Sequence, residues 1–86
     1  MDGRRWVTDP GLASRLWRLY EKMNPMVPEP IHLVLMDDTV VRGRTAGSSF
    51  EFLHPKEPLS GIRGEIRVNA SGQQLSVDLA DVKAVL

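Results

Sequence analysis

Hydrophobic residues near the start of the chain recur with the period of an α-helix. At about 100° per residue, seven apolar or aromatic residues share one continuous face: Leu12, Ala13, Leu16, Trp17, Leu19, Tyr20 and Met23. Asp9 followed by Pro10 is typical of a helix start, because aspartate accepts a hydrogen bond at the N-cap and proline fits the first turn. The pattern predicts a helix over residues 9–24. Leu16 and Tyr20 lie near the middle of its apolar face and are expected to be buried against the sheet or against a partner subunit.

The predicted helix is flanked by two segments without helical periodicity. Residues 1–8 are expected to form a loose leader. Asn24 followed by Pro25 should end the helix, because a residue before proline avoids the α region. Residues 25–30 contain three prolines and are expected to form a stiff, extended connector.

From residue 31 onward the hydrophobic pattern has the shorter period of β-strands. It predicts short strands separated by turn signals, over residues 31–36, 39–45, 49–53, 64–69, 74–79 and 83–86. Gly43 inside the second strand is expected to mark a bulge or sharp bend. Residues 46–48 should form a turn or kink, residues 54–61 the longest loop, and residues 79–82 one tight helical turn.

This order of elements predicts a fold of the α+β class that is mainly β. We expect residues 1–86 to form a single domain, in which an N-terminal amphipathic helix precedes a five- to six-stranded bent antiparallel sheet. The sheet over residues 31–86 is expected to curl into a small β-barrel. The alternative is a short open sheet packed on the helix. A chain of 86 residues buries a modest fraction of its surface, so homo-oligomerisation is one way to gain stability.

Two stretches of the chain resemble Sm-like and SH3-like small-barrel domains. Residues 35–44, LMDDTVVRGR, have the apolar strand, acidic turn and glycine-bent second strand with which Sm-like domains begin. Residues 75–85, LSVDLADVKAV, are similar to the last strands and tight turn of SH3-like barrels. The order also resembles the bacterial Rho-binding antitermination proteins, a family of small Sm-like regulators. The RNA-holding asparagine of Sm proteins has no counterpart in residues 48–52, SSFEF, so the resemblance implies the fold and leaves the RNA site open.

The composition limits the classes of function. Eleven basic and eleven acidic residues balance, which argues against a strong sequence-independent grip on nucleic acid but permits a local basic face. Without cysteine there is no disulfide, thiolate zinc site or cysteine nucleophile. The longest apolar run, residues 33–36, is too short to cross a membrane, and no apolar run follows the first arginines as in a secretory signal. A cytoplasmic protein without a membrane partner is expected.

No residue pattern indicates catalysis. His32 and His54 are far apart and match no metal-binding spacing, so neither a metal nor another cofactor is expected. Two acidic pairs are explained by turn formation and by capping of the tight turn: Asp37 with Asp38, and Asp78 with Asp81. The serines lie in no nucleophile motif. We therefore expect a protein that is not an enzyme.

Basic residues are the remaining candidates for function. Seven form the candidate binding surface: Arg15, Arg18, Lys22, Arg42, Arg44, Arg63 and Arg67. The three on the helix share one side of its polar face, where guanidinium groups suit phosphates and carboxylates, although a solvated helix face has the same composition. Those on strands share outward faces, which either bind a partner or protect a sheet edge by charge.

The sequence thus predicts a non-catalytic small-barrel binding module. In the first hypothesis it is a bacterial regulator that contacts nucleic acid, RNA in particular, or a nucleic-acid-associated protein. In the alternative it is a protein-interaction or assembly subunit without nucleic-acid contact. The two hypotheses predict a different dependence of affinity on salt concentration, because the affinity for nucleic acid falls steeply as the salt concentration rises.

Overall fold

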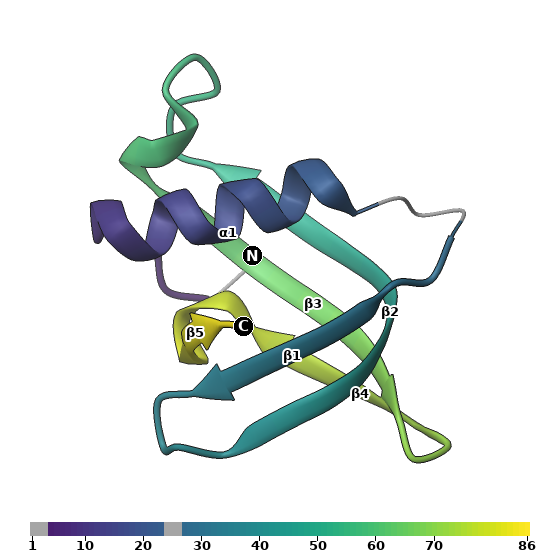
Figure 1. Cartoon of the computed structure of the whole chain (residues 1–86). Helices are drawn as coiled ribbons and strands as arrows, with labels where there is room; N and C mark the ends of the chain where they lie inside the picture. Colours follow the sequence, from purple (N-terminus) through teal and green to yellow (C-terminus); the bar gives the residue numbers. More distant parts are fainter. Residues whose placement is uncertain (1–3, 24–26) are drawn as a thin grey trace.

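Helix α1 (Pro10–Lys22) lies across one end of a strongly curled antiparallel sheet in the computed structural model, which describes residues 4–23 and 27–86 (Figure 1). The sheet consists of β1 (Pro30–Leu35), β2 (Val40–Phe52), β3 (Ile62–Ala70), β4 (Gln73–Asp78) and β5 (Val82–Val85). Two short 3-10 turns, η1 (Pro58–Ser60) and η2 (Leu79–Asp81), precede β3 and β5. The α+β class with a mainly β composition is therefore confirmed.

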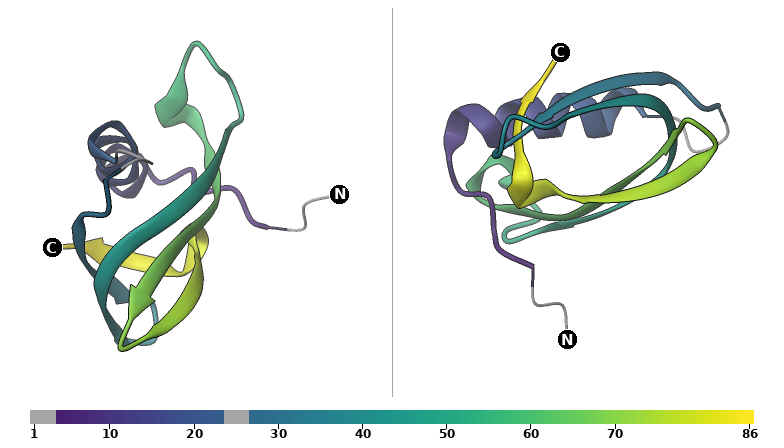
Figure 2. Two further views of the ribbon diagram at one scale, coloured as in Figure 1. Left: turned by 90° about the vertical axis from the view of Figure 1, so that its right-hand side faces the viewer. Right: turned by 90° about the horizontal axis from the view of Figure 1, so that it is seen from below.

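The five strands follow the order β4-β3-β2-β1-β5, and every neighbouring pair is antiparallel. The curl places β1 and β4 on opposite sides of the interior (Figure 2). Only η2 separates β4 from β5 along the chain, yet within the described ranges no strand pairing joins these two edges. The structure thus has the predicted bent sheet, with an open seam between β4 and β5.

Strand β2 is one continuous element where the sequence predicted two strands separated by a turn or kink at residues 46–48. No turn separates two strands here, and the irregularity is a kink within β2. Thr45 lies opposite Val68 and Gly47 lies opposite Arg67, so Ala46 is an extra residue in β2 and forms a bulge. Gly47 has a φ of 130°, which favours glycine. The chain therefore bends within a strand and keeps its hydrogen bonds to β3 on both sides of the bend.

The bulge in β2 is not at Gly43, where the sequence predicted a bulge or sharp bend. Gly43 pairs regularly with Ile31 of β1. A β-carbon at Gly43 would lie 2.1 Å from the carbonyl oxygen of Asn69 in β3, so this glycine permits a close approach of two backbones.

Helix α1 begins and ends close to the predicted positions. Asp9 is the N-cap, and its Oδ2 accepts a hydrogen bond from the backbone nitrogen of Leu12 at 2.9 Å. The helix ends at Lys22, and the C-cap Met23 donates its backbone N–H to the Leu19 carbonyl. The predicted stop at Asn24 and Pro25 lies outside the described residues. None of the helices in the described ranges is long and apolar enough to span a membrane.

The hydrophobic core lies between α1 and the inner face of the curled sheet. Its buried members come from the helix, all five strands, η2 and the leader: Val7, Ala13, Leu16, Ile31, Leu33, Val41, Ile62, Ile66, Val68, Val77, Leu79 and Val82. Leu16 is fully buried, as predicted. Tyr20 is 40% exposed, so it is not buried against the sheet, and its burial against a partner subunit stays a prediction. Its ring covers the edge of Phe50 and Phe52 at the margin of the core.

The described part of the leader is fixed to the sheet, so the prediction of a loose segment is wrong for residues 4–7. Val7 is buried and forms a two-way backbone bridge with Ile62, with N···O distances of 2.7 and 3.0 Å. Arg4 pairs with Glu65 and Arg5 with Asp81. Trp6 and Val7 are adjacent and do not alternate with polar residues, so they gave no strand pattern and the sequence did not indicate this bridge.

Candidate binding surface

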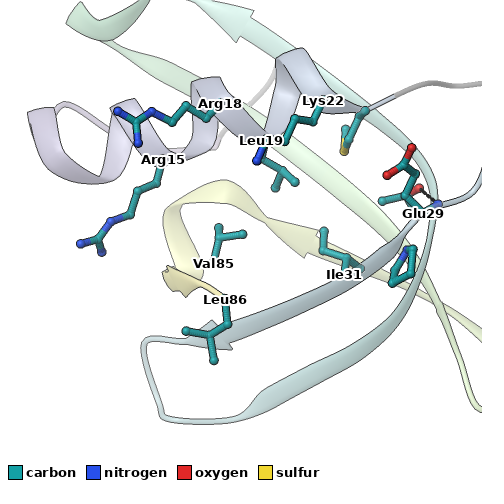
Figure 3. Close-up of a pocket in the computed structure, with 11 residues that line it drawn as sticks. Arg15, Arg18, Leu19, Lys22, Glu29, Ile31, Val85 and Leu86 are labelled. Atoms are coloured by element: carbon teal, nitrogen blue, oxygen red, sulfur yellow. Dashed lines mark hydrogen bonds between the residues drawn. The ribbon is translucent and has the colours of Figure 1, made fainter.

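Three basic residues of α1 line a groove of about 360 Å³ beside the helix (Figure 3). They are Arg15, Arg18 and Lys22, all exposed and all on the side of the helix that the sequence pattern predicted. At a rise of about 1.5 Å per residue, the row from Arg15 to Lys22 extends for about 10 Å along the helix. The groove therefore presents a line of positive charges to anything that lies along it.

The floor of this groove is apolar. It is formed by Leu19 of the helix, Ile31 at the start of β1 and Val85 of β5, with the exposed Leu86 at the margin (Figure 3). These residues meet because β1 pairs with both β2 and β5 near the end of the helix. A ligand with both negatively charged and apolar groups can therefore contact the basic side chains and the apolar floor at the same time.

One carboxylate side chain, that of Glu29, lines the far wall of the groove. Its backbone is fixed by Thr45, which is buried: the Glu29 N–H donates to Thr45 Oγ1 at 2.9 Å, and the Thr45 N–H donates to the Glu29 carbonyl at 2.9 Å. Three cationic side chains thus face one anionic side chain, and the local charge is positive although the whole chain is neutral.

Arg42 and Arg44 lie on the outer face of β2, as the alternation predicted. Both are exposed, and they lie opposite His32 and Pro30 of β1. Arg42 Nε donates to His32 Nε2 over a long 3.4 Å. A shallow hollow of about 520 Å³ beside Arg42 shares Pro30, Ile31 and Leu86 with the helix groove. The hollow beside Arg42 therefore adjoins the helix groove at the start of β1.

The two remaining candidates are held in intramolecular ion pairs. Arg63 Nε and Nη2 donate to Glu51 Oε2 at 3.0 and 2.8 Å, and its guanidinium lies 4.4 Å from the centre of the Trp6 ring. Arg67 Nη1 donates to Glu65 Oε1 at 2.9 Å. The contacts of Arg63 join β3 to β2 and to the leader, whereas the pair of Arg67 with Glu65 lies within β3. The predicted set of seven therefore divides into two groups.

Glu65 is the centre of the second ion pair. It accepts hydrogen bonds from the Ser76 hydroxyl, Arg67 and Arg4. The Ser76 hydroxyl, and then the two arginines, hold the pKa of Glu65 below its ordinary value and outweigh the opposing effect of desolvation. Arg67 thus has a strong internal partner.

The three basic residues of α1 and Arg44 differ from Arg63 and Arg67, which are held in ion pairs. In the part of the chain that the structure describes, no side-chain hydrogen bond or ion pair is found for Arg15, Arg18, Lys22 or Arg44. Their charges are therefore the ones most available to an external partner.

The acidic residues and histidines that the sequence analysis considered lie in turns, on strands and in an exposed loop. Asp37 accepts from the Thr39 N–H in the β1–β2 turn, and the hydrogen bonds from Thr39 lower its pKa. Asp78 caps η2 by accepting from the Ala80 N–H at 2.9 Å, as predicted. His32 is on β1 and His54 is in the exposed loop before η1. Across residues 4–23 and 27–86, no group of three or more potential metal-ligating side chains occurs.

The sequence did not indicate the floor of the groove or the partners of Arg63 and Arg67. Both depend on strand register, which joins residues far apart in the chain, such as Glu51 directly opposite Arg63.

Comparisons of the chain with protein-family models, curated proteins and solved structures gave no match.

Proposed function

We propose that the domain is a non-catalytic binding module that holds single-stranded RNA in the groove between α1 and β1. The observation that carries the proposal is the row of Arg15, Arg18 and Lys22, which have no ion pair among the described residues and face one carboxylate side chain. Cations without internal partners gain most from an external phosphate, because they lose no existing pair.

The shape of the groove favours a single strand. An extended RNA backbone can follow the row of cations, while sugars and unstacked bases cover the apolar floor of Leu19, Ile31 and Val85. Arg42 and Arg44 extend the positive surface beyond β1. The neutral chain as a whole implies moderate affinity that depends on this local surface.

The arrangement of elements supports an Sm-like or SH3-like barrel as the scaffold for this module. A helix precedes the first strand, β1 pairs with both β2 and β5, and a 3-10 turn separates β4 from β5. This order is similar to that of small-barrel domains. Within this proposal the protein is a cytoplasmic bacterial regulator whose partner is RNA.

The test is a salt titration of binding to a labelled single-stranded oligoribonucleotide. Three phosphate contacts predict a slope of about −2 for the logarithm of the binding constant against the logarithm of the salt concentration. Substitution of Arg15, Arg18 and Lys22 together by Gln should remove most of this slope and of the affinity.

A matched control replaces three basic residues outside the groove by Gln: Arg5, Lys56 and Lys83. This variant has the same net charge, and it loses only the exposed pairs of Arg5 with Asp81 and Lys83 with Asp38. It should keep most of the affinity. Equal losses in the two variants would mean that net charge alone determines binding, and the absence of salt-dependent binding in the wild type would refute the proposal.

The alternative of a protein-assembly subunit is favoured by one observation. Met36 and Val40 flank the β1–β2 turn and are both more than half exposed. Apolar residues at an exposed turn suit a protein partner. In that case the domain retains its partner after nuclease treatment and does not bind the oligoribonucleotide.

A further inference from the structure

A second hollow lies on the other side of Met23 from the groove. It has a volume of about 480 Å³ and lies between the end of α1 and the bulge in β2. Met23 and Thr45 line both the hollow and the groove, so the two spaces adjoin. A volume of this size accommodates a small planar ligand.

Tyr20 supplies an aromatic surface to this hollow. Its ring lies 5.6 Å from Trp17, 4.8 Å from Phe50 and 5.5 Å from Phe52, measured between ring centres. These contacts hold the ring in place, while 40% of the residue remains exposed. An aromatic ring that is fixed by its neighbours and still accessible can stack on a planar group at little entropic cost.

Arg67 supplies a positive charge to the same hollow. Its guanidinium lies against Gly47, where a β-carbon would be 2.8 Å from Nη2 and 3.4 Å from Cζ. Glu65 accepts from Nη1, and Nη2 has no hydrogen-bond partner in the described part of the chain. The ion pair thus orients the guanidinium and leaves one of its nitrogens for an anion.

Two further side chains give the hollow hydrogen-bonding groups. Glu21 is exposed and offers a carboxylate, and Ser48 offers a hydroxyl. A carboxylate accepts from amino groups such as that of adenine or cytosine, whereas it repels phosphate. The hollow therefore combines a stacking surface, a cation and an acceptor.

We propose that this hollow holds one nucleotide of the RNA strand, with the base on Tyr20, a phosphate at Arg67 Nη2 and the amino edge of the base toward Glu21. The inference rests on the proposed function, because the strand that follows the cationic groove continues past Met23 into the hollow. The occupant is a nucleotide within a strand, and a free nucleotide of the same chemistry is tested separately.

The experiment compares a short oligoadenylate with an oligomer of the same length that lacks bases. Wild-type protein should bind the oligoadenylate about tenfold more tightly, since stacking of one base is commonly worth a factor of this size. Tyr20→Leu should reduce affinity for the oligoadenylate several-fold and leave affinity for the oligomer without bases unchanged. Tyr20→Phe, which keeps the ring, should restore most of the preference, and melting curves establish that the variants are folded.

The groove variant Arg15→Gln/Arg18→Gln/Lys22→Gln separates this inference from the proposed function. It should weaken both oligomers equally and leave the preference for bases. If the wild-type protein binds both oligomers with salt dependence but without any preference for bases, the nucleotide site is overturned and the RNA-binding groove is supported. If it binds neither oligomer, both the nucleotide site and the proposed function are refuted. Adenosine monophosphate is tested in the same way. If it binds as tightly as the oligoadenylate and the groove variant does not change its affinity, the hollow binds a free nucleotide, and the inference that it holds part of an RNA strand is overturned.

Photo-crosslinking tests the site without any substitution. An oligonucleotide that carries 5-iodocytidine, which keeps the amino group of the base, reacts on irradiation with aromatic side chains on which the base stacks. Crosslinks mapped to Tyr20 in the wild-type protein support the inference. Crosslinks found only at residues outside the hollow overturn it.

Discussion

The α-carbon of Gly43 in β2 faces the carbonyl group of Asn69 in β3 so closely that a β-carbon would lie 2.1 Å from the oxygen and 2.9 Å from the carbonyl carbon. Val68 Cγ1 would be 2.9 Å away as well. Gly43 directly precedes Arg44, which pairs with Asn69, so this approach lies where the pairing of β2 with β3 begins. Any side chain at this position forces a backbone to move.

Gly43→Ala should therefore destabilise the protein by about 3 kcal/mol, the upper end for overpacked interiors. Gly11→Ala is the matched control, because a β-carbon on this exposed helical glycine meets only Asp9 Oδ2 at an ordinary 3.4 Å. It should leave stability unchanged or raise it by up to about 1 kcal/mol. Denaturant titrations measure both changes, and a loss below about 1 kcal/mol for Gly43→Ala would contradict the close approach.

Leu16 should be the most sensitive apolar position of the helix. It is fully buried between α1 and the sheet, so Leu16→Ala removes apolar contacts and leaves a cavity, at a cost of about 2–5 kcal/mol. Leu53→Ala is a suitable control, since Leu53 is 44% exposed. Similar free energies of unfolding for the two variants would show that the helix is not docked on the sheet.

Local periodicity was sufficient to predict most elements of this fold. The helix from Pro10 to Lys22 and the capping of η2 by Asp78 follow from residues close in the chain. The continuity of β2 could not be predicted in this way. Gly47 and Ser48 have the composition of a turn, and only the pairing of Gly47 with Arg67 keeps the chain in a strand.

The same distinction holds for the candidate site. The helical period alone placed Arg15, Arg18 and Lys22 on one side of α1, and the structure has them there. The ion pair of Arg63 could not be predicted from local periodicity, because it depends on the strand register that places Glu51 of β2 directly opposite Arg63. Tyr20 shows a third limit, since a helical pattern does not reveal how far the sheet extends beneath the helix.

Acid should weaken the contact between the leader and β3 through Glu65. Its pKa is lowered in the folded state, chiefly by the Ser76 hydroxyl and then by Arg67 and Arg4. A lowered folded pKa gives stability that is present above the unfolded value of about 4.5 and is lost as the pH falls through the folded pKa. Glu65→Gln should thus be less stable than the wild type near neutral pH.

The difference between Glu65→Gln and the wild type should shrink as the pH falls below about 4.5. Asp37, whose pKa Thr39 lowers, gives both proteins a common acid sensitivity and so cancels in the comparison. Thermal melting across the acid range measures the difference. A gap that stays constant down to the lowest pH would mean that the charge of Glu65 does not contribute.

The strand arginines should separate into structural and surface residues. The side chain of Arg42 has a single long hydrogen bond to His32, and the side chain of Arg44 has no hydrogen bond or ion pair to any described residue. The double substitution Arg42→Gln/Arg44→Gln should therefore change the free energy of unfolding by less than about 0.5 kcal/mol. Arg63→Gln loses two hydrogen bonds to Glu51 and the contact with Trp6, so it should cost about 1 kcal/mol.

Denaturant titration combined with the salt-dependent binding assay distinguishes the two groups. If the outer face of β2 contacts RNA, the double variant keeps its stability and loses affinity, whereas Arg63→Gln loses stability and keeps most of its affinity. A double variant that is as unstable as Arg63→Gln would mean that Arg42 and Arg44 have structural partners. A double variant with unchanged stability and unchanged affinity would leave the RNA contact to the groove beside α1 alone.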